Sequence, residues 1–149
     1  MNLQKRIWII SMSIAAVFMS SCERDLNKGV DYDSPQADIA VDTFEVDRGE
    51  TIEIKALVRD DSGIAYLALE YANWNLKDEQ SFDEGNRASE YGYAYNVKVP
   101  LDALYEWEEI YTKHDGTQFT IKQRYHKLSL TCYDGVKNKN IFYFYVKVK

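Results

Sequence analysis

Residues 125–148 read YHKLSLTCYDGVKNKNIFYFYVKV and hold two alternating segments joined by a turn. Before the turn, apolar Leu128 and Leu130 alternate with polar residues, and after it Phe144 and Val146 continue the same spacing. A period of two residues is typical of a β-strand that buries one face. The stretch therefore predicts an antiparallel hairpin near the end of the chain.

Four earlier segments also have the spacing of strands, and they are residues 39–46, 51–58, 64–72 and 91–99. Asp, Ser and Gly are frequent in the turns between them, because Asp and Ser side chains bond to the nearby backbone and Gly accepts a positive φ. Residues 73–90 break the alternation and predict a long loop or a short, weak strand.

Residues 101–111 have helical rather than strand-like spacing. Leu101, Leu104 and Tyr105 share one face of a helix and Asp102 suits its N-terminus, so we expect one or two helical turns here. No longer amphipathic segment competes with the strands. The sequence therefore predicts an all-β fold, an Ig-like antiparallel β-sandwich of about seven strands.

The start of the chain has the pattern of a lipoprotein signal. Lys5 and Arg6 precede a short apolar run, residues 7–19, and two serines then lead to Cys22. This pattern predicts a lipoprotein signal peptide, residues 1–21, whose removal leaves a lipid on Cys22. The alternative is a transmembrane anchor, but the 13 residues of the run fall short of the ~20 that a spanning helix requires.

Removal of 21 of the 149 residues leaves 128, which suits one domain with its own core. Residues 22–36 are polar, contain Gly29 and Pro35, and show no periodicity, so they predict a lipidated flexible tether. Residues 37–149 then form the sandwich domain. The lipid on the tether is the expected contact with the membrane.

The net charge argues against nucleic acid as a partner. Two of the 18 Lys and Arg residues and none of the 24 Asp and Glu residues lie in the predicted signal, which leaves 16 against 24 and a formal charge of −8. Proteins that bind nucleic acids neutralise phosphates with Lys and Arg. We therefore expect no nucleic-acid ligand.

The chain has two cysteines, and a lipid on Cys22 leaves Cys132 without an intramolecular partner. Cys132 lies in an alternating apolar segment, and no basic group that would activate a thiolate stands near it in the sequence. We therefore predict a buried strand thiol rather than a nucleophile.

Five short motifs spread over the mature chain define its layout: Cys22-Glu23-Arg24-Asp25, Ser34-Pro35, VRDDSGI at residues 58–64, VPL at residues 99–101 and LTCYDG at residues 130–135. Together they resemble the Ig-like or cadherin-like sandwich domains of surface lipoproteins from Bacteroides-type bacteria. The resemblance implies a lipid-anchored outer-membrane protein without catalytic residues, and the acidic residues after Cys22 resemble signals for display on the cell surface.

Aromatic residues gather in the two irregular segments that a sandwich would place at the end away from the tether. Flat rings beside amide and carboxylate groups suit sugars, whose C–H faces stack while their hydroxyls form hydrogen bonds. The alternative is that the rings plug the end of the core, since large aromatics bury most of their area. The predicted ligand-binding residues are Trp74, Trp107, Tyr105, Tyr111 and His114.

Acidic residues gather in loops at the tether end. Ca²⁺ takes six to eight oxygen ligands, so these carboxylates are candidates for a calcium site. The other interpretation is that Asp is simply a residue that turns prefer. The candidate ligands are Asp31, Asp33, Asp60, Asp61 and Asp134, and the sequence points to no other cofactor.

The sequence contains no recognised catalytic motif, and His114 and His126 lie in different settings. Glu106 with Glu108 or Glu109 would supply two carboxylates for a glycosidase, but such a site needs a deep cleft with a controlled carboxylate separation. We therefore expect that the protein is not an enzyme.

These observations predict a non-catalytic binding domain on a surface lipoprotein, with glycans as ligands of the outward-facing aromatics. The alternative is a structural or interaction lipoprotein that docks onto a partner outer-membrane protein through exposed strand edges or the tyrosine-rich residues 91–95. Exposed tryptophans would favour a sugar ligand, whereas a flat apolar patch with a charged rim would favour a protein.

Overall fold

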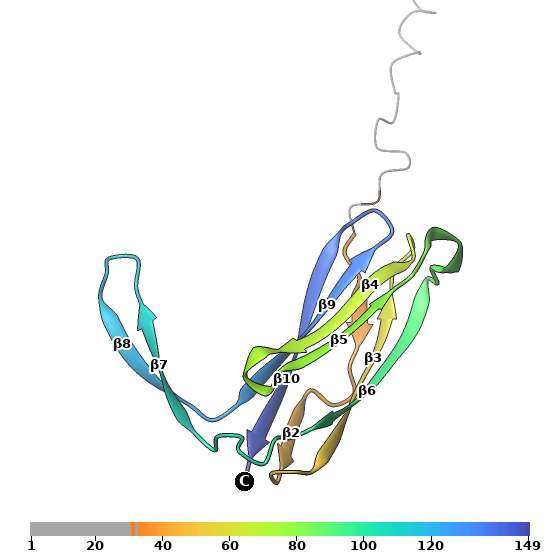
Figure 1. Cartoon of the computed structure of the whole chain (residues 1–149). Coiled ribbons are helices and arrows are strands. Elements are labelled where there is room, and N and C mark those ends of the chain that lie inside the picture. Colours follow the sequence, from red (N-terminus) through yellow and green to blue (C-terminus); the bar gives the residue numbers. More distant parts are fainter. Residues whose placement is uncertain (1–30, 32) are drawn as a thin grey trace, which may run out of the picture. The chain divides into compact units, whose positions relative to one another are not determined.

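Two β-sheets pack face to face in the part of the chain that the structure describes (Figure 1). This computed structural model describes residue 31 and residues 33–149, so the predicted signal peptide, the predicted lipid site Cys22 and most of the tether lie outside the described residues. The predicted all-β sandwich is confirmed. Within the described residues, no helix has the length and hydrophobicity needed to cross a membrane.

The two sheets of the sandwich contain eight strands between them. In spatial order, the larger sheet consists of β2 (Thr43–Val46), β10 (Lys139–Val148), β9 (His126–Asp134), β4 (Ile64–Tyr71) and β5 (Leu76–Ser81). The smaller sheet consists of β1 (Gln36–Asp38), β3 (Thr51–Arg59) and β6 (Glu90–Lys98). Neighbouring strands are antiparallel except β2 and β10, which are parallel.

Alternating strands turn their apolar residues inward from both sheets. Ile54 of β3, Leu130 of β9 and Phe144 of β10 are fully buried, as their spacing predicts. Cys132 is buried in the same core, and burial raises the pKa of its thiol to about 12. The prediction of a buried strand thiol is therefore confirmed.

Residues 39–46 do not form the single strand that we expected. Residues 39–42 instead link β1, which ends at Asp38 and pairs with β3 of the smaller sheet, to β2, which begins at Thr43 and pairs with β10 of the larger sheet. The backbone N–H of Tyr145 donates to the carbonyl of Asp42 at 2.7 Å, where the chain joins the second sheet. A segment that changes sheets needs no continuous alternation, which explains the weak pattern of residues 39–46.

Residues 73–90 contain the strand β5 between two short 3-10 turns, η1 (Ala72–Trp74) and η2 (Glu84–Asn86). β5 lies at the edge of its sheet, and two of its inward positions, Asp78 and Gln80, are polar. The buried Tyr93 donates a hydrogen bond to Asp78 at 2.8 Å, and Tyr91 donates one to Gln80 at 2.6 Å. Hydrogen bonds from tyrosine hydroxyls of β6 thus connect the smaller sheet to the edge strand of the larger sheet.

Residues 101–111 form no helix, so that prediction was wrong. One turn, in which Ala103 N–H bonds to the carbonyl of Pro100, leads instead to β7 (Trp107–Thr112) and then β8 (Gln118–Gln123). Among the strands that the structure describes, these two pair only with each other, and they project from the sandwich as a hairpin (Figure 1). Leu101, Leu104 and Tyr105 therefore do not share the face of a helix.

We predict that Tyr93→Phe destabilises the domain by about 1–3 kcal/mol, because the inward-pointing Asp78 carboxylate loses its buried donor. Urea unfolding of the chain from Glu23 onward measures the change. Tyr91→Phe is the matched control, since Tyr91 is only half-buried and its partner Gln80 is uncharged, so a smaller loss is expected. Equal losses in the two variants would show that the carboxylate does not depend on Tyr93.

Candidate functional site

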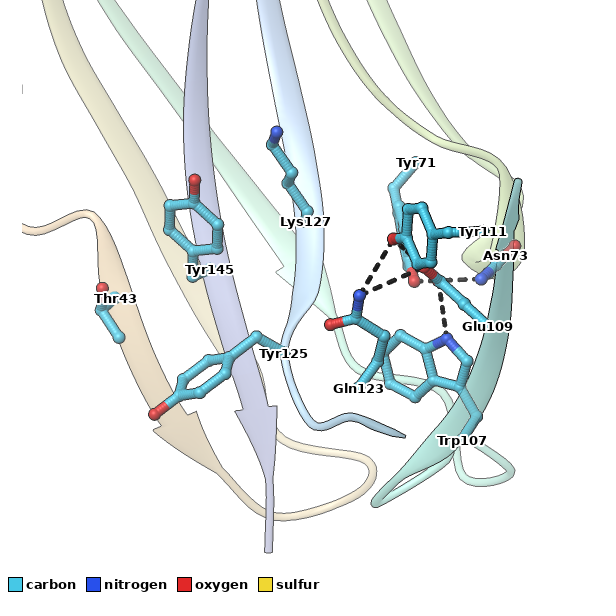
Figure 2. Close-up of a pocket in the computed structure, with 10 residues that line it drawn as sticks. All are labelled: Thr43, Tyr71, Asn73, Trp107, Glu109, Tyr111, Gln123, Tyr125, Lys127 and Tyr145. Atoms are coloured by element: carbon cyan, nitrogen blue, oxygen red, sulfur yellow. Dashed lines mark hydrogen bonds between the residues drawn. The ribbon is translucent and has the colours of Figure 1, made fainter. Parts of the chain in front are cut away.

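A cleft of about 530 Å³ lies between the β7–β8 hairpin and the outer face of the five-stranded sheet (Figure 2). One wall comes from the hairpin and the other from β2, β9, β10 and the end of β4. Half of the ten lining residues are aromatic. The lining residues are Thr43, Tyr71, Asn73, Trp107, Glu109, Tyr111, Gln123, Tyr125, Lys127 and Tyr145.

The alternation of β7 places Trp107, Glu109 and Tyr111 on the face of the hairpin that lines the cleft. Gln123 joins them because it lies opposite Trp107 in the β7–β8 register. Glu109 holds the group together, since it accepts hydrogen bonds from Trp107 Nε1 at 2.8 Å, Tyr111 Oη at 2.5 Å and Gln123 Nε2 at 3.2 Å. The hairpin wall is therefore an ordered hydrogen-bonded surface.

The carboxylate of Glu109 has a structural role in this wall. The hydrogen bond from Tyr111, followed by the one from Trp107, holds the pKa of Glu109 below its usual range, so the group is ionised and accepts protons poorly. Glu106 forms ion pairs with Lys122 and Arg124 outside the cleft lining, and Glu108 alternates onto the opposite face of the hairpin. The structure does not bring these carboxylates together in the cleft.

The sheet wall carries Tyr125, Tyr145 and Lys127. Lys127 lies directly opposite Tyr145 in the β9–β10 register, and its ammonium group lies 3.6 Å from the ring centroid of Tyr143, the next outward residue of β10. In Figure 2 no dashed line joins these three side chains to one another or to the other residues drawn.

His126 joins the two walls at the base of the cleft. It is 2% exposed, and its ring lies 4.6 Å from both the Trp74 and Trp107 rings. Nε2 lies 2.9 Å from the carbonyl oxygen of Leu104 and must carry the proton, so Nδ1 accepts from the hydroxyl of Tyr71 at 2.9 Å. Burial lowers the pKa of His126, and the bond to Leu104 offsets part of this effect.

The structure brings two of the five predicted sugar-binding residues together in the cleft, Trp107 and Tyr111. Trp74 packs beneath it against His126, and its indole nitrogen is buried without a hydrogen-bond partner among the described residues. The guanidinium carbon of Arg48 lies 3.9 Å from the ring centroid of Tyr105. His114 lies in the exposed turn between β7 and β8. These three residues do not line the cleft.

Sequence reasoning missed the sheet wall of the cleft. The signal was the odd-numbered outward face of β9 and β10, where Tyr125, Lys127 and Tyr145 alternate with core residues. The outward position of such side chains was predictable. Their position opposite a hairpin was not, because the sequence pattern did not indicate that hairpin.

Three of the predicted calcium ligands, Asp31, Asp60 and Asp134, offer carboxylate oxygens within 4.8 Å of one another. Asp33 and Asp61 are exposed and do not belong to this group. The loops at the tether end therefore converge as predicted. With one oxygen from each, these carboxylates supply three of the six to eight oxygens that Ca²⁺ takes.

The three converging carboxylates are also occupied by turn hydrogen bonds. Asp134 accepts from the backbone of Val136 and Asn138, Asp60 accepts from Ser62 N–H, and Asp31 accepts from the hydroxyl of Ser62. Burial, and then the charge of Asp134, raise the pKa of Asp60. This arrangement favours the turn interpretation of the acidic cluster.

We predict that His126 makes stability depend on pH. The folded-state pKa of His126 is below the usual 6.5, so the neutral imidazole contributes its full share to the free energy of unfolding above pH 6.5. As the pH falls below 6.5 this contribution is lost, by at most about 1.4 kcal/mol per pH unit. Urea unfolding at about pH 7.5 and about pH 5.5 measures the loss. His126→Phe should lose less stability between the two pH values than the parent does. His114→Gln, at an exposed site, should lose as much as the parent. Equal losses in all three proteins would contradict the prediction.

We predict that Asp60→Asn raises the melting temperature of the domain by a few degrees at neutral pH, measured in the presence of a metal chelator. The amide oxygen still accepts from Ser62 N–H, while the repulsion from Asp31 and Asp134 disappears. Added Ca²⁺ should leave the parent unchanged. A Ca²⁺-dependent rise in the parent that Asp60→Asn abolishes would instead identify a calcium site, since a bound ion stabilises the fold by mass action.

Comparisons of this chain with protein-family models, curated proteins and solved structures find no match. The resemblance to sandwich domains of surface lipoproteins therefore stays a prediction that rests on the motifs quoted for it. Similarity assigns no ligand to the cleft.

Proposed function

We propose that the protein is a lipid-anchored lipoprotein of the outer membrane, displayed on the cell surface, whose sandwich domain binds glycans without catalysis. The observation that carries the proposal is the cleft with aromatic residues on both walls. Trp107 and Tyr111 project from the hairpin, and Tyr125 and Tyr145 project from the sheet (Figure 2).

The polar groups of the cleft complement a sugar. Asn73 and Gln123 use their amide nitrogens within the protein, so each directs a carbonyl oxygen that a sugar hydroxyl can bind. The phenol groups of Tyr125 and Tyr145 can both donate and accept. Aromatic faces beside such groups match the alternation of C–H and hydroxyl on a pyranose ring.

The position of the cleft agrees with a membrane anchor at the N-terminus. Asp31, at the start of the described domain, lies beside the turns at Asp60 and Asp134. The cleft lies toward the other end of the β9–β10 pair, where Lys127 pairs with Tyr145. A lipid on Cys22 would therefore hold the acidic end near the membrane and leave the cleft accessible.

The second candidate function is docking onto a partner outer-membrane protein, and the exposed hairpin favours it. Ile110, on the face opposite the cleft, is 70% exposed, and Phe119 and Ile121 are also exposed. The tyrosine-rich residues 91–95 offer less surface, because Tyr93 is buried and its neighbours Tyr91 and Tyr95 pack against the core.

A glycan array probed with the full-length chain in mild detergent tests the proposal. We predict that Trp107→Ala with Tyr145→Ala weakens binding about tenfold or more, since each ring removes stacking on one wall. Tyr105→Ala is the matched control, because Tyr105 is exposed outside the cleft.

Unchanged binding in a folded double variant would remove the cleft as the glycan site. An array without any hit, together with crosslinking of residue 110 to one outer-membrane protein in intact cells, would favour the docking function instead.

A further inference from the structure

We infer that the ligand is an extended glycan bearing negative charges, carboxylate or sulfate, that lies along β9 and β10 on the outer face of the larger sheet. This inference rests on the proposed glycan-binding function. It comes from the distribution of paired and unpaired charges around the cleft.

Lys127 is the one cation among the residues that line the cleft. Its ammonium lies over the ring of Tyr143, and no carboxylate among the described residues comes within ion-pair distance of it. The ring of Tyr143 attracts the ammonium group but does not neutralise its charge. Lys127 therefore lines the cleft and carries a positive charge that no carboxylate of the described residues matches.

Other cations near the cleft are already matched. Lys122 and Arg124 pair with Glu106 beside the hairpin, and Lys147 pairs with Glu45 at 2.9 Å. Unlike these three cations, Lys127 shares its charge with no carboxylate among the described residues.

Glu109, the one carboxylate in the lining, does not compete for Lys127. Both of its oxygens accept hydrogen bonds from the hairpin wall, from Trp107, Tyr111 and Gln123. The negative charge of Glu109 is thus held on one wall by three donors, while the positive charge stands on the other. A ligand anion would contact Lys127 from the sheet side of the cleft.

The same face continues beyond the cleft as a row of tyrosines and lysines. Tyr145, Tyr143 and Tyr133 point outward along β9 and β10, and Tyr143 is 39% exposed. Lys139, opposite Tyr133, holds its ammonium 5.5 Å from the centroid of that ring and, like Lys127, has no ion-pair partner among the described residues.

The spacing along this row sets the length of the ligand. Lys139 precedes Tyr143, over whose ring the ammonium of Lys127 lies, by four residues in β10, which corresponds to about 13 Å along the strand. One sugar unit cannot reach both amines, whereas a chain of several units can. On the neighbouring strands Glu79 pairs with Lys77, and Glu70 adds negative charge, so the path of an anionic chain follows β9 and β10 instead.

Matched oligosaccharides test the inference with the full-length chain in mild detergent. The probes are an oligomer of uronic acids, the same oligomer with its carboxyl groups reduced to alcohols, and a sulfated oligomer of equal length. We expect the charged oligomers to bind about tenfold more tightly than the reduced one, with an affinity that falls as salt rises. The carboxylate and sulfate arms identify which anion is preferred.

Lys127→Met should weaken the binding of the charged oligomers much more than that of the reduced oligomer, because it removes the positive charge and keeps the aliphatic stem. Lys139→Met should weaken the binding of long charged oligomers more than that of short ones. Lys122→Met is the matched control, since that lysine already pairs with Glu106 outside the cleft.

Equal affinity for charged and reduced oligomers, or an equal loss for both in Lys127→Met, would overturn the anionic ligand and leave glycan binding intact. Absence of binding by every oligomer and by the wider glycan array would overturn the proposed function itself, and the inference with it.

Discussion

A buried histidine connects the two walls of the cleft, and the cleft depends on that connection. The β7–β8 hairpin pairs with no other strand of the described residues, and a two-stranded ribbon is marginal in water by itself. His126 donates a hydrogen bond to the carbonyl of Leu104, which precedes the hairpin, and accepts one from Tyr71, the last residue of β4. The rings of Trp74 and Trp107 each lie 4.6 Å from its ring. The neutral imidazole is therefore both a hydrogen-bond bridge and a packing element.

The two faces of the larger sheet differ in their residues and in their role. Its inner face is apolar along β9 and β10 and builds the core, while its outer face carries tyrosines and lysines that remain exposed or half-exposed. The edge strand β5 departs from this division, since Asp78 and Gln80 point inward. Polar residues that face inward on an edge strand discourage pairing with another chain, and Tyr93 and Tyr91 make them tolerable.

The sequence predicted the strands whose alternation comes from deep burial, such as residues 51–58 and 125–148. The sequence did not predict strands reliably where few side chains are buried or where the inward side chains are polar. β5 was expected only as a short, weak strand because its inward positions are polar, and β7 was missed because a projecting hairpin buries little of either face. Trp107 and Tyr111 were identified by residue type, whereas Trp74 and Tyr105 show that type alone does not separate a cleft wall from packing.

Two-walled construction has a thermodynamic consequence for binding. The hairpin wall is ordered internally by Glu109 and is attached to the sandwich through the His126 cluster, so few contacts fix its distance from the sheet. A ligand that touches Trp107 on one wall and Tyr145 on the other adds contacts that only the docked hairpin can make. Ligand binding and hairpin docking must then favour each other, because a ligand stabilises the arrangement to which it binds. The same coupling is absent for a ligand that contacts the sheet face alone.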